Sequence, residues 1–158
     1  MTEGRDRGLK VFLVAGETSG DNLGAKLMRE LRARQWNVQF EGVGGPQMEA
    51  EGLKSLFPMA DIAVMGFLPV IRRLPTLLER IRPTAMMAEV TRPDVLVIID
   101  SPDFTHRVAR RVRARMPGLA VVNYVSPTVW AWREGRARKM RGYIDHVLAL
   151  LPFEPAAH

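Results

Sequence analysis

The stretch Ala15-Gly16-Glu17-Thr18-Ser19-Gly20-Asp21 decides the fold that the sequence predicts. The apolar run at residues 9–14 before it indicates a buried strand, and residues 21–34 after it have the apolar spacing of a helix. A strand that turns into a helix through a loop with two glycines is a common ligand-binding element of α/β proteins. The sequence therefore predicts a ligand site close to this loop.

Individual residues of the loop suggest what that ligand is. Gly16 and Gly20 allow close backbone approach. Ser19 or Asp21 can cap the following helix, because a side-chain oxygen there accepts hydrogen bonds from its free N–H groups. Glu17 disfavours a bound phosphate, so a sugar hydroxyl or a role in proton transfer suits this loop better.

Strands and helices alternate along the rest of the chain. Further strands are predicted at residues 38–43, 94–100, 119–125 and 144–151, and helices at residues 47–51, 105–115 and 133–141. The run at 94–100 is apolar without alternation, which is typical of a central parallel strand covered on both faces. The alternation predicts an α/β fold, a doubly wound parallel sheet of the Rossmann-like kind, in a single domain over residues 1–158.

Composition narrows the classes of function. The net charge of +6 and the pI of about 10.5 suit an anionic partner, although an Arg-rich genome would produce the same bias. Nucleic acid is not expected, because no recognition motif is present and the Arg residues are spread over several helices. The sequence has no Cys and no metal-ligand spacing of His, so neither a disulfide nor a metal is implied.

The segment from residue 65 to 93 mixes apolar and Arg residues. Pro69, Pro75 and Pro83 are expected to break it into short helical pieces. It is interpreted either as a basic amphipathic surface for an anionic bilayer or as a core-facing helix with a solvated Arg face. No run of about 20 apolar residues and no signal peptide is visible, so a cytoplasmic location is expected. The membrane interpretation rests on five apolar residues: Met65, Phe67, Leu68, Ile71 and Leu74.

Four loops with uncommon residues should meet beyond the carboxyl ends of the strands, where such sheets bind ligands: residues 16–21, 42–46, 100–104 and 126–132. Asp100 follows an apolar strand, and partial burial there would raise the pKa of its carboxyl group, as suits a general base. Asp103 fits better as the cap of the helix predicted from Thr105. Trp130 and Trp132 could stack on a sugar, wall a lipid channel or simply pack.

Six motifs together resemble one family, the lipid-A-disaccharide synthases, in the N-terminal half of their sequence. They come in the family's order and span residues 9 to 155, and the fifth is very specific. The motifs are GETSGD at 16–21, GVGGPQM at 42–48, AVMG at 63–66, IDSPDF at 99–104, YVSPTVWAWR at 124–133 and LPFE at 151–154.

The resemblance implies a glycosyltransferase of the GT-B fold, at the inner face of the cytoplasmic membrane of Gram-negative bacteria. Such an enzyme joins UDP-2,3-diacylglucosamine to 2,3-diacylglucosamine 1-phosphate, releases UDP and needs no cofactor. Asp100 matches the proposed general base, and Arg133 could meet the acceptor phosphate. The apolar pieces near residues 65–78 would meet acyl chains and the anionic inner-membrane surface. The residues expected on the acceptor side of the cleft are Glu17, Ser19, Gly20, Asp103, Ser126, Trp130 and Arg133.

The length departs from the family pattern, because family members are about twice as long. The C-terminal domain, which would hold the UDP-sugar donor, is expected to be absent, and the 158-residue chain alone is expected to show no turnover. The alternative interpretation is a Rossmann-like module that binds an acylated sugar phosphate or a membrane surface without catalysis.

Overall fold

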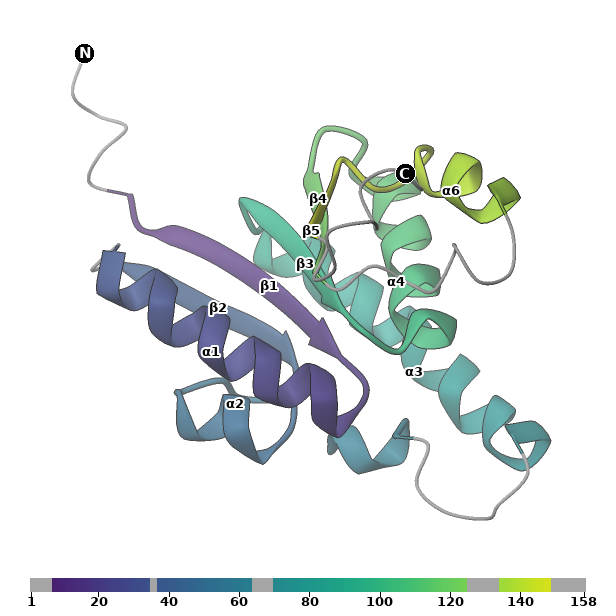
Figure 1. The fold of residues 1–158 in the computed structure, drawn as a ribbon, viewed down its shortest axis with the longest axis horizontal. Helices are drawn as coiled ribbons and strands as arrows, with labels where there is room; N and C mark the ends of the chain where they lie inside the picture. The colour runs from purple at the N-terminus through teal and green to yellow at the C-terminus, as the bar shows by residue number, and fades with distance from the viewer. Residues whose placement is uncertain (1–6, 35–36, 64–69, 125–133, 149–158) are drawn as a thin grey trace.

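A computed structural model describes residues 7–34, 37–63, 70–124 and 134–148 of the chain (Figure 1). Its centre is a five-stranded, all-parallel sheet in the order β2-β1-β3-β4-β5. The strands are β1 (Leu9–Ala15), β2 (Val38–Val43), β3 (Val95–Ile99), β4 (Ala120–Tyr124) and β5 (His146–Leu148). The predicted α/β class with a parallel sheet is confirmed.

Helices cover both faces of the sheet (Figure 1). Helix α1 (Thr18–Arg34) covers one face with the short α2 (Pro46–Ala50) beside it. Helices α3 (Val70–Thr91) and α4 (Pro102–Arg115) pack together on the other face, next to α6 (Glu134–Met140). A short 3-10 helix, η1 (Met59–Asp61), comes before α3 in the chain. None of the described helices has the length and apolar character needed to cross a membrane.

The core explains why β1 and β3 carry apolar runs without alternation. Both strands lie inside the sheet and are covered on both faces, so consecutive side chains are buried. Phe12, Leu13 and Val14 of β1 are fully buried, as are Leu96 and Ile98 of β3.

Helix α3 corrects one prediction, because it runs unbroken through Pro75 and Pro83. Each proline removes a backbone hydrogen bond and crowds the preceding turn. The buried positions Ile81, Ala85 and Ala88 hold the helix in the core. Tertiary packing along this face therefore outweighs the local cost of the prolines.

Several predicted boundaries also shift. Helix α4 begins at Pro102 rather than at 105, because Pro is well suited to the first position of a helix. Helix α1 begins at Thr18. Strand β5 does not include Ile144, whose N–H instead bonds the carbonyl of Met140 in the turn after α6. Residues 149–151 of the predicted strand lie outside the described residues.

The direction in which strands are added reverses at β1. From β1 the chain moves to β2 on one side, then crosses to β3 on the other side of β1. In open α/β sheets ligands bind at such a reversal, outside the carboxyl ends of the two strands involved. The loops that follow β1 and β3 are therefore the first place to look for a site.

Candidate functional site

The loops after β1 and β3 are joined by a hydrogen bond between side chains. The hydroxyl of Ser19, in the first turn of α1, donates to Oδ2 of Asp100, the residue after β3. The sequence suggested Ser19 as a cap of its own helix, but the Ser19 side chain bonds Asp100 instead. The contact brings together two predicted site residues that are 81 positions apart in the sequence.

The backbone at Asp100 is held in an unusual conformation. Asp100 has φ 54° and Ser101 has φ 45°, so two consecutive non-glycine residues are left-handed. The Asp100 carboxylate accepts the N–H of Ser101 at 2.9 Å, and the Thr105 hydroxyl donates to the Asp100 carbonyl at 2.7 Å. Residues in this region cost about 1–3 kcal/mol each and concentrate at functional sites. These contacts turn the Asp100 side chain towards the loop after β1.

Close packing holds the loop after β1 against this turn. A Cβ added at Gly16 would lie 2.6 Å from Cβ of Ser101, and one at Gly20 would lie 3.1 Å from the carbonyl oxygen of Ile99. Both glycines are buried. They are needed here for close approach between two loops, which places Gly20 beneath the site rather than in contact with solvent.

A third loop is attached through Asp21. Its carboxylate is 2% exposed and accepts backbone N–H groups of Gly45, Gln47 and Met48 at 2.9–3.0 Å. Asp21 thus caps α2, not its own helix α1. Three of the four predicted loops converge at the carboxyl edge of the sheet, and the fourth, at 126–132, lies outside the described residues.

Three carboxylates give the site its electrostatic character. Burial, followed by the charges of Asp100 and Asp103, raises the pKa of the Glu17 carboxyl group. Such an arrangement suits binding of sugar hydroxyls and proton transfer, since each carboxylate accepts hydrogen bonds. Among the described residues no group of three or more His, Asp or Glu side chains is arranged to hold a metal ion.

Asp103 differs from its predicted role as a helix cap. It lies in the first turn of α4 and is exposed, and the N-cap residue is Ser101, which makes no side-chain capping bond. Its charge reaches Glu17, so it remains part of the site. Ser126, Trp130 and Arg133 lie outside the described residues.

The predicted apolar surface is partly visible on α3. Ile71 is 81% exposed, and Leu74 and Leu78 are 41% and 45% exposed. Their spacing of three and four residues places them on one side of the helix. Arg80, by contrast, is engaged with Asp61 at 2.7 Å and lies over the Phe57 ring. Met65, Phe67 and Leu68 lie outside the described residues.

Comparisons with known proteins identify the family. The family model described as lipid-A-disaccharide synthetase matches residues 11–158. The chain belongs to this family.

Curated relatives agree with the family match. The lipid-A-disaccharide synthase of Nitrobacter winogradskyi is 63% identical over 150 residues, which are 94% of this chain and 38% of the relative. That of Rhodopseudomonas palustris strain BisB18 is 67% identical over 147 residues, covering 92% of this chain and 37% of the relative. That of Rhodospirillum centenum is 54% identical over 151 residues, covering 93% of this chain and 37% of the relative. The chain therefore spans under two-fifths of these family members' length.

Four residues near the site escaped the sequence analysis. His106 and Arg110 of α4 lie beside Lys139 of α6 and Tyr143 of the turn that follows it, around a cavity next to Asp103. The i, i+4 spacing of His106 and Arg110 on one helix was a usable signal. The contact with Tyr143 was not, because it joins segments 37 positions apart.

Proposed function

We propose that this chain forms the acceptor-sugar side of a lipid-A-disaccharide synthase, with Asp100 as the general base. The observation that carries the proposal is the hydrogen bond from Ser19 to the Asp100 carboxylate at the β1/β3 reversal, within the family's motifs. A base must lie within reach of the proton that it removes and must be held in place. Ser19 and the Ser101 N–H hold this carboxylate from two sides.

The chemistry assigned to the site is an inverting glycosyl transfer. Asp100 removes the proton of the 6-hydroxyl of 2,3-diacylglucosamine 1-phosphate. The resulting oxygen attacks the anomeric carbon of UDP-2,3-diacylglucosamine, the bond from that carbon to the UDP oxygen breaks, and UDP leaves. Asp100 holds the proton, and the product is a β-1,6-linked disaccharide.

Glu17 and Asp103 are assigned to binding rather than to proton removal. The charge of Asp103 acts on Glu17, so the two carboxylates lie near each other. Carboxylates there accept hydrogen bonds from sugar hydroxyls. Ser126, Trp130 and Arg133 remain predicted acceptor contacts from the motif at 124–133.

The test is a chimera, because the relatives extend well beyond the matched region. This chain is fused to the remaining C-terminal part of the Nitrobacter winogradskyi protein, and formation of disaccharide and UDP is measured by mass spectrometry. Asp100→Asn should lower kcat by roughly 10²–10⁴-fold, the usual effect of a lost general base. Asp94→Asn, a change of the same kind at the opposite end of β3, is the matched control and should retain activity within about threefold.

Three possible results bear on this proposal and on the alternative of a binding module. Turnover by the chimera that falls in Asp100→Asn but not in Asp94→Asn supports the general base. Turnover that is equal in both variants would show that Asp100 is not the base. A chimera that is folded and binds the acceptor but forms no disaccharide would favour the non-catalytic module.

The exposed apolar side of α3 supports a peripheral position on an anionic inner-membrane surface. Ile71 and Leu74 are exposed apolar residues, and Arg72 between them is exposed as well. Apolar side chains entering a bilayer beside basic residues gain both hydrophobic and electrostatic free energy. Removing two such side chains should therefore weaken membrane binding strongly.

Sedimentation with phosphatidylglycerol vesicles tests this surface. The double variant Ile71→Glu/Leu74→Glu should reduce the bound fraction at least about tenfold. Val90→Glu, an equally exposed apolar position near the other end of α3, should reduce it little. Equal losses in the two variants would refute the assignment.

A further inference from the structure

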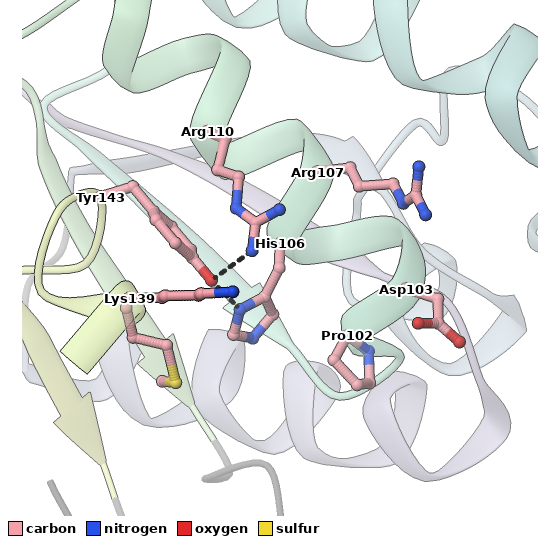
Figure 2. Close-up of a pocket in the computed structure, with 8 residues that line it drawn as sticks. Pro102, Asp103, His106, Arg107, Arg110, Lys139 and Tyr143 are labelled. Carbon is pink, nitrogen blue, oxygen red and sulfur yellow. Dashed lines mark hydrogen bonds between the residues drawn. The ribbon is translucent and has the colours of Figure 1, made fainter. Parts of the chain in front are cut away.

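A polar cavity of about 140 Å³ lies between α4 and the end of α6 (Figure 2). It begins at Pro102 and Asp103 in the first turn of α4 and extends along that helix to Arg110. Lys139 and Tyr143 line its other side. Because the charge of Asp103 also acts on Glu17, this end of the cavity lies near the carboxylate site.

Basic groups dominate the walls of this cavity. Arg107, Arg110 and Lys139 line it, against the single carboxylate of Asp103. In the described part of the chain, no carboxylate lies within ion-pair distance of these three basic side chains. Further along the same helix, Arg113 pairs with Asp145 and Arg115 with Glu89. Among the side chains that the structure describes, the cavity therefore holds more basic groups than acidic ones, and no ion pair occupies them.

A buried pair of rings fixes the position of one of these cations. Tyr143 is 7% and His106 is 8% exposed, and the Tyr143 hydroxyl lies 2.8 Å from Nδ1 of His106. The Arg110 guanidinium lies 4.9 Å from the centre of the Tyr143 ring and donates to its hydroxyl at 3.5 Å. Arg110 is thus held over an aromatic face before any ligand arrives, which lowers the entropy lost on binding.

The polarity of the cavity changes along its length. Figure 2 shows Lys139, His106 and Tyr143 towards one end of the cavity and Asp103 towards the other, with Arg107 on the Asp103 side. Basic groups bind phosphate oxygens, and carboxylates accept hydrogen bonds from sugar hydroxyls. A ligand that matches both ends has a phosphate at one end and hydroxyl groups at the other.

We infer that this cavity binds the phosphate group of a phosphorylated sugar, with Arg110 and Lys139 as the direct ligands of the phosphate. The inference rests on the proposed function, in which the acceptor carries a 1-phosphate, and it assigns that phosphate to α4 and α6. The sugar then extends past Asp103 towards Glu17 and Asp100. His106 and Tyr143 are positioning residues that hold Arg110.

Calorimetric titration of the 158-residue chain with glucosamine 1-phosphate at low ionic strength tests the inference. Glucosamine and inorganic phosphate are the comparison ligands, and both should bind at least about tenfold more weakly, because each matches one end only. Arg110→Gln and Lys139→Gln should each raise Kd for glucosamine 1-phosphate about tenfold, the loss of one partly exposed charge-assisted contact.

The matched controls are the neighbouring basic residues. Arg111→Gln and Arg138→Gln remove the same charge from the same two helices without touching the cavity, and should change Kd less than about twofold. Arg133→Gln tests the other residue that the sequence analysis predicted to contact the acceptor phosphate. Absence of glucosamine 1-phosphate binding, equal binding of inorganic phosphate, or equal effects of cavity and control variants would overturn the inference. So would a loss of affinity confined to Arg133→Gln.

Kinetics of the chimera separate this inference from the proposed function. Lys139→Gln should raise KM for the phosphorylated acceptor about tenfold and leave kcat within about twofold, because Lys139 holds the ligand away from the reacting oxygen. An active chimera in which Asp100→Asn abolishes turnover but Lys139→Gln leaves KM unchanged refutes phosphate binding in the cavity and leaves the proposed function standing. An inactive chimera with phosphate binding lost in the cavity variants refutes the synthase assignment alone.

Discussion

Replacing Asp21 by Ala should separate the loop after β2 from the loop after β1. The Asp21 carboxylate is 2% exposed and accepts three backbone N–H groups at the start of α2, from Gly45, Gln47 and Met48. In the described part of the chain, no other buried charged side chain links these two loops. The substitution therefore tests how much of the site's framework depends on a single side chain.

The expected loss follows from the exposure of the three donors. The N–H groups of Gly45 and Met48 are buried, and each loses its only carboxylate partner, at roughly 1–3 kcal/mol per group. The N–H of Gln47 is partly buried and can be rehydrated. Ala recovers up to about 0.7 kcal/mol through its helix propensity. The net loss is about 3 kcal/mol, a large fraction of the roughly 5–15 kcal/mol typical of a domain.

Urea denaturation followed by circular dichroism measures this loss. Asp21→Asn keeps one acceptor oxygen for Gly45 and Met48 and loses only the bond to Gln47, so it should cost about 1 kcal/mol. Glu30→Ala, on the same helix with an exposed ion pair to Arg34, should cost under about 0.5 kcal/mol. The reasoning fails if Asp21→Ala costs less than about 1 kcal/mol, or if Asn and Ala cost the same.

Three further changes have distinct signatures. Burial and the charges of Asp100 and Asp103 raise the pKa of the Glu17 carboxyl group. The contribution of Glu17 to stability is therefore present below the unfolded pKa of 4.5 and is lost as pH rises through the folded pKa. In urea denaturation, Glu17→Gln should stabilise the fold at pH 7 by up to about 1 kcal/mol and have no effect at about pH 3. Burial alone would raise the pKa of Asp145, but the Val121 N–H and Arg113 outweigh it and lower that pKa, so its stabilisation is present above 3.8 and disappears as pH falls through the folded value. Asp145→Asn should therefore destabilise by about 1 kcal/mol at pH 7 and less at about pH 2, and an equal loss at both pH values would contradict this. Gly16→Ala places a Cβ 2.6 Å from Ser101 Cβ and should cost about 1–3 kcal/mol in thermal denaturation, whereas Gly118→Ala, with no atom within 4 Å, should cost under about 1 kcal/mol.

The sequence predicted the parallel sheet because its strongest signals are local. Buried runs such as residues 9–14 and 94–100 have no other stable place than the middle of a covered sheet. The proline rule failed in α3, where burial of Ile81, Ala85 and Ala88 outweighs the cost of Pro75 and Pro83. Local propensity lost to tertiary packing there, and the sequence of α3 alone does not reveal which neighbour supplies that packing.

The meeting of the loops at one edge of the sheet was predicted, but the contacts between them were not. The β1 and β3 loops were expected at one edge, and the Ser19 to Asp100 bond confirms that they meet. The roles of Ser19 and Asp21 as caps of their own helix were wrong, because each side chain reaches a segment far along the chain. The cavity beside α6 was missed for the same reason, since its walls come from two helices that only the fold brings together.

Asp21 and Asp100 lie at the same edge of the sheet but in different environments. The Asp21 carboxylate is buried and accepts three backbone N–H groups, so it stabilises the fold and is not accessible to a substrate. Asp100 remains half-buried on a left-handed backbone, next to a Glu17 whose carboxyl pKa is raised. Both the strained backbone and the crowded carboxylates lower stability. Features that cost stability concentrate where function maintains them, and this supports the proposal that Asp100, rather than the better-bonded Asp21, carries the chemistry.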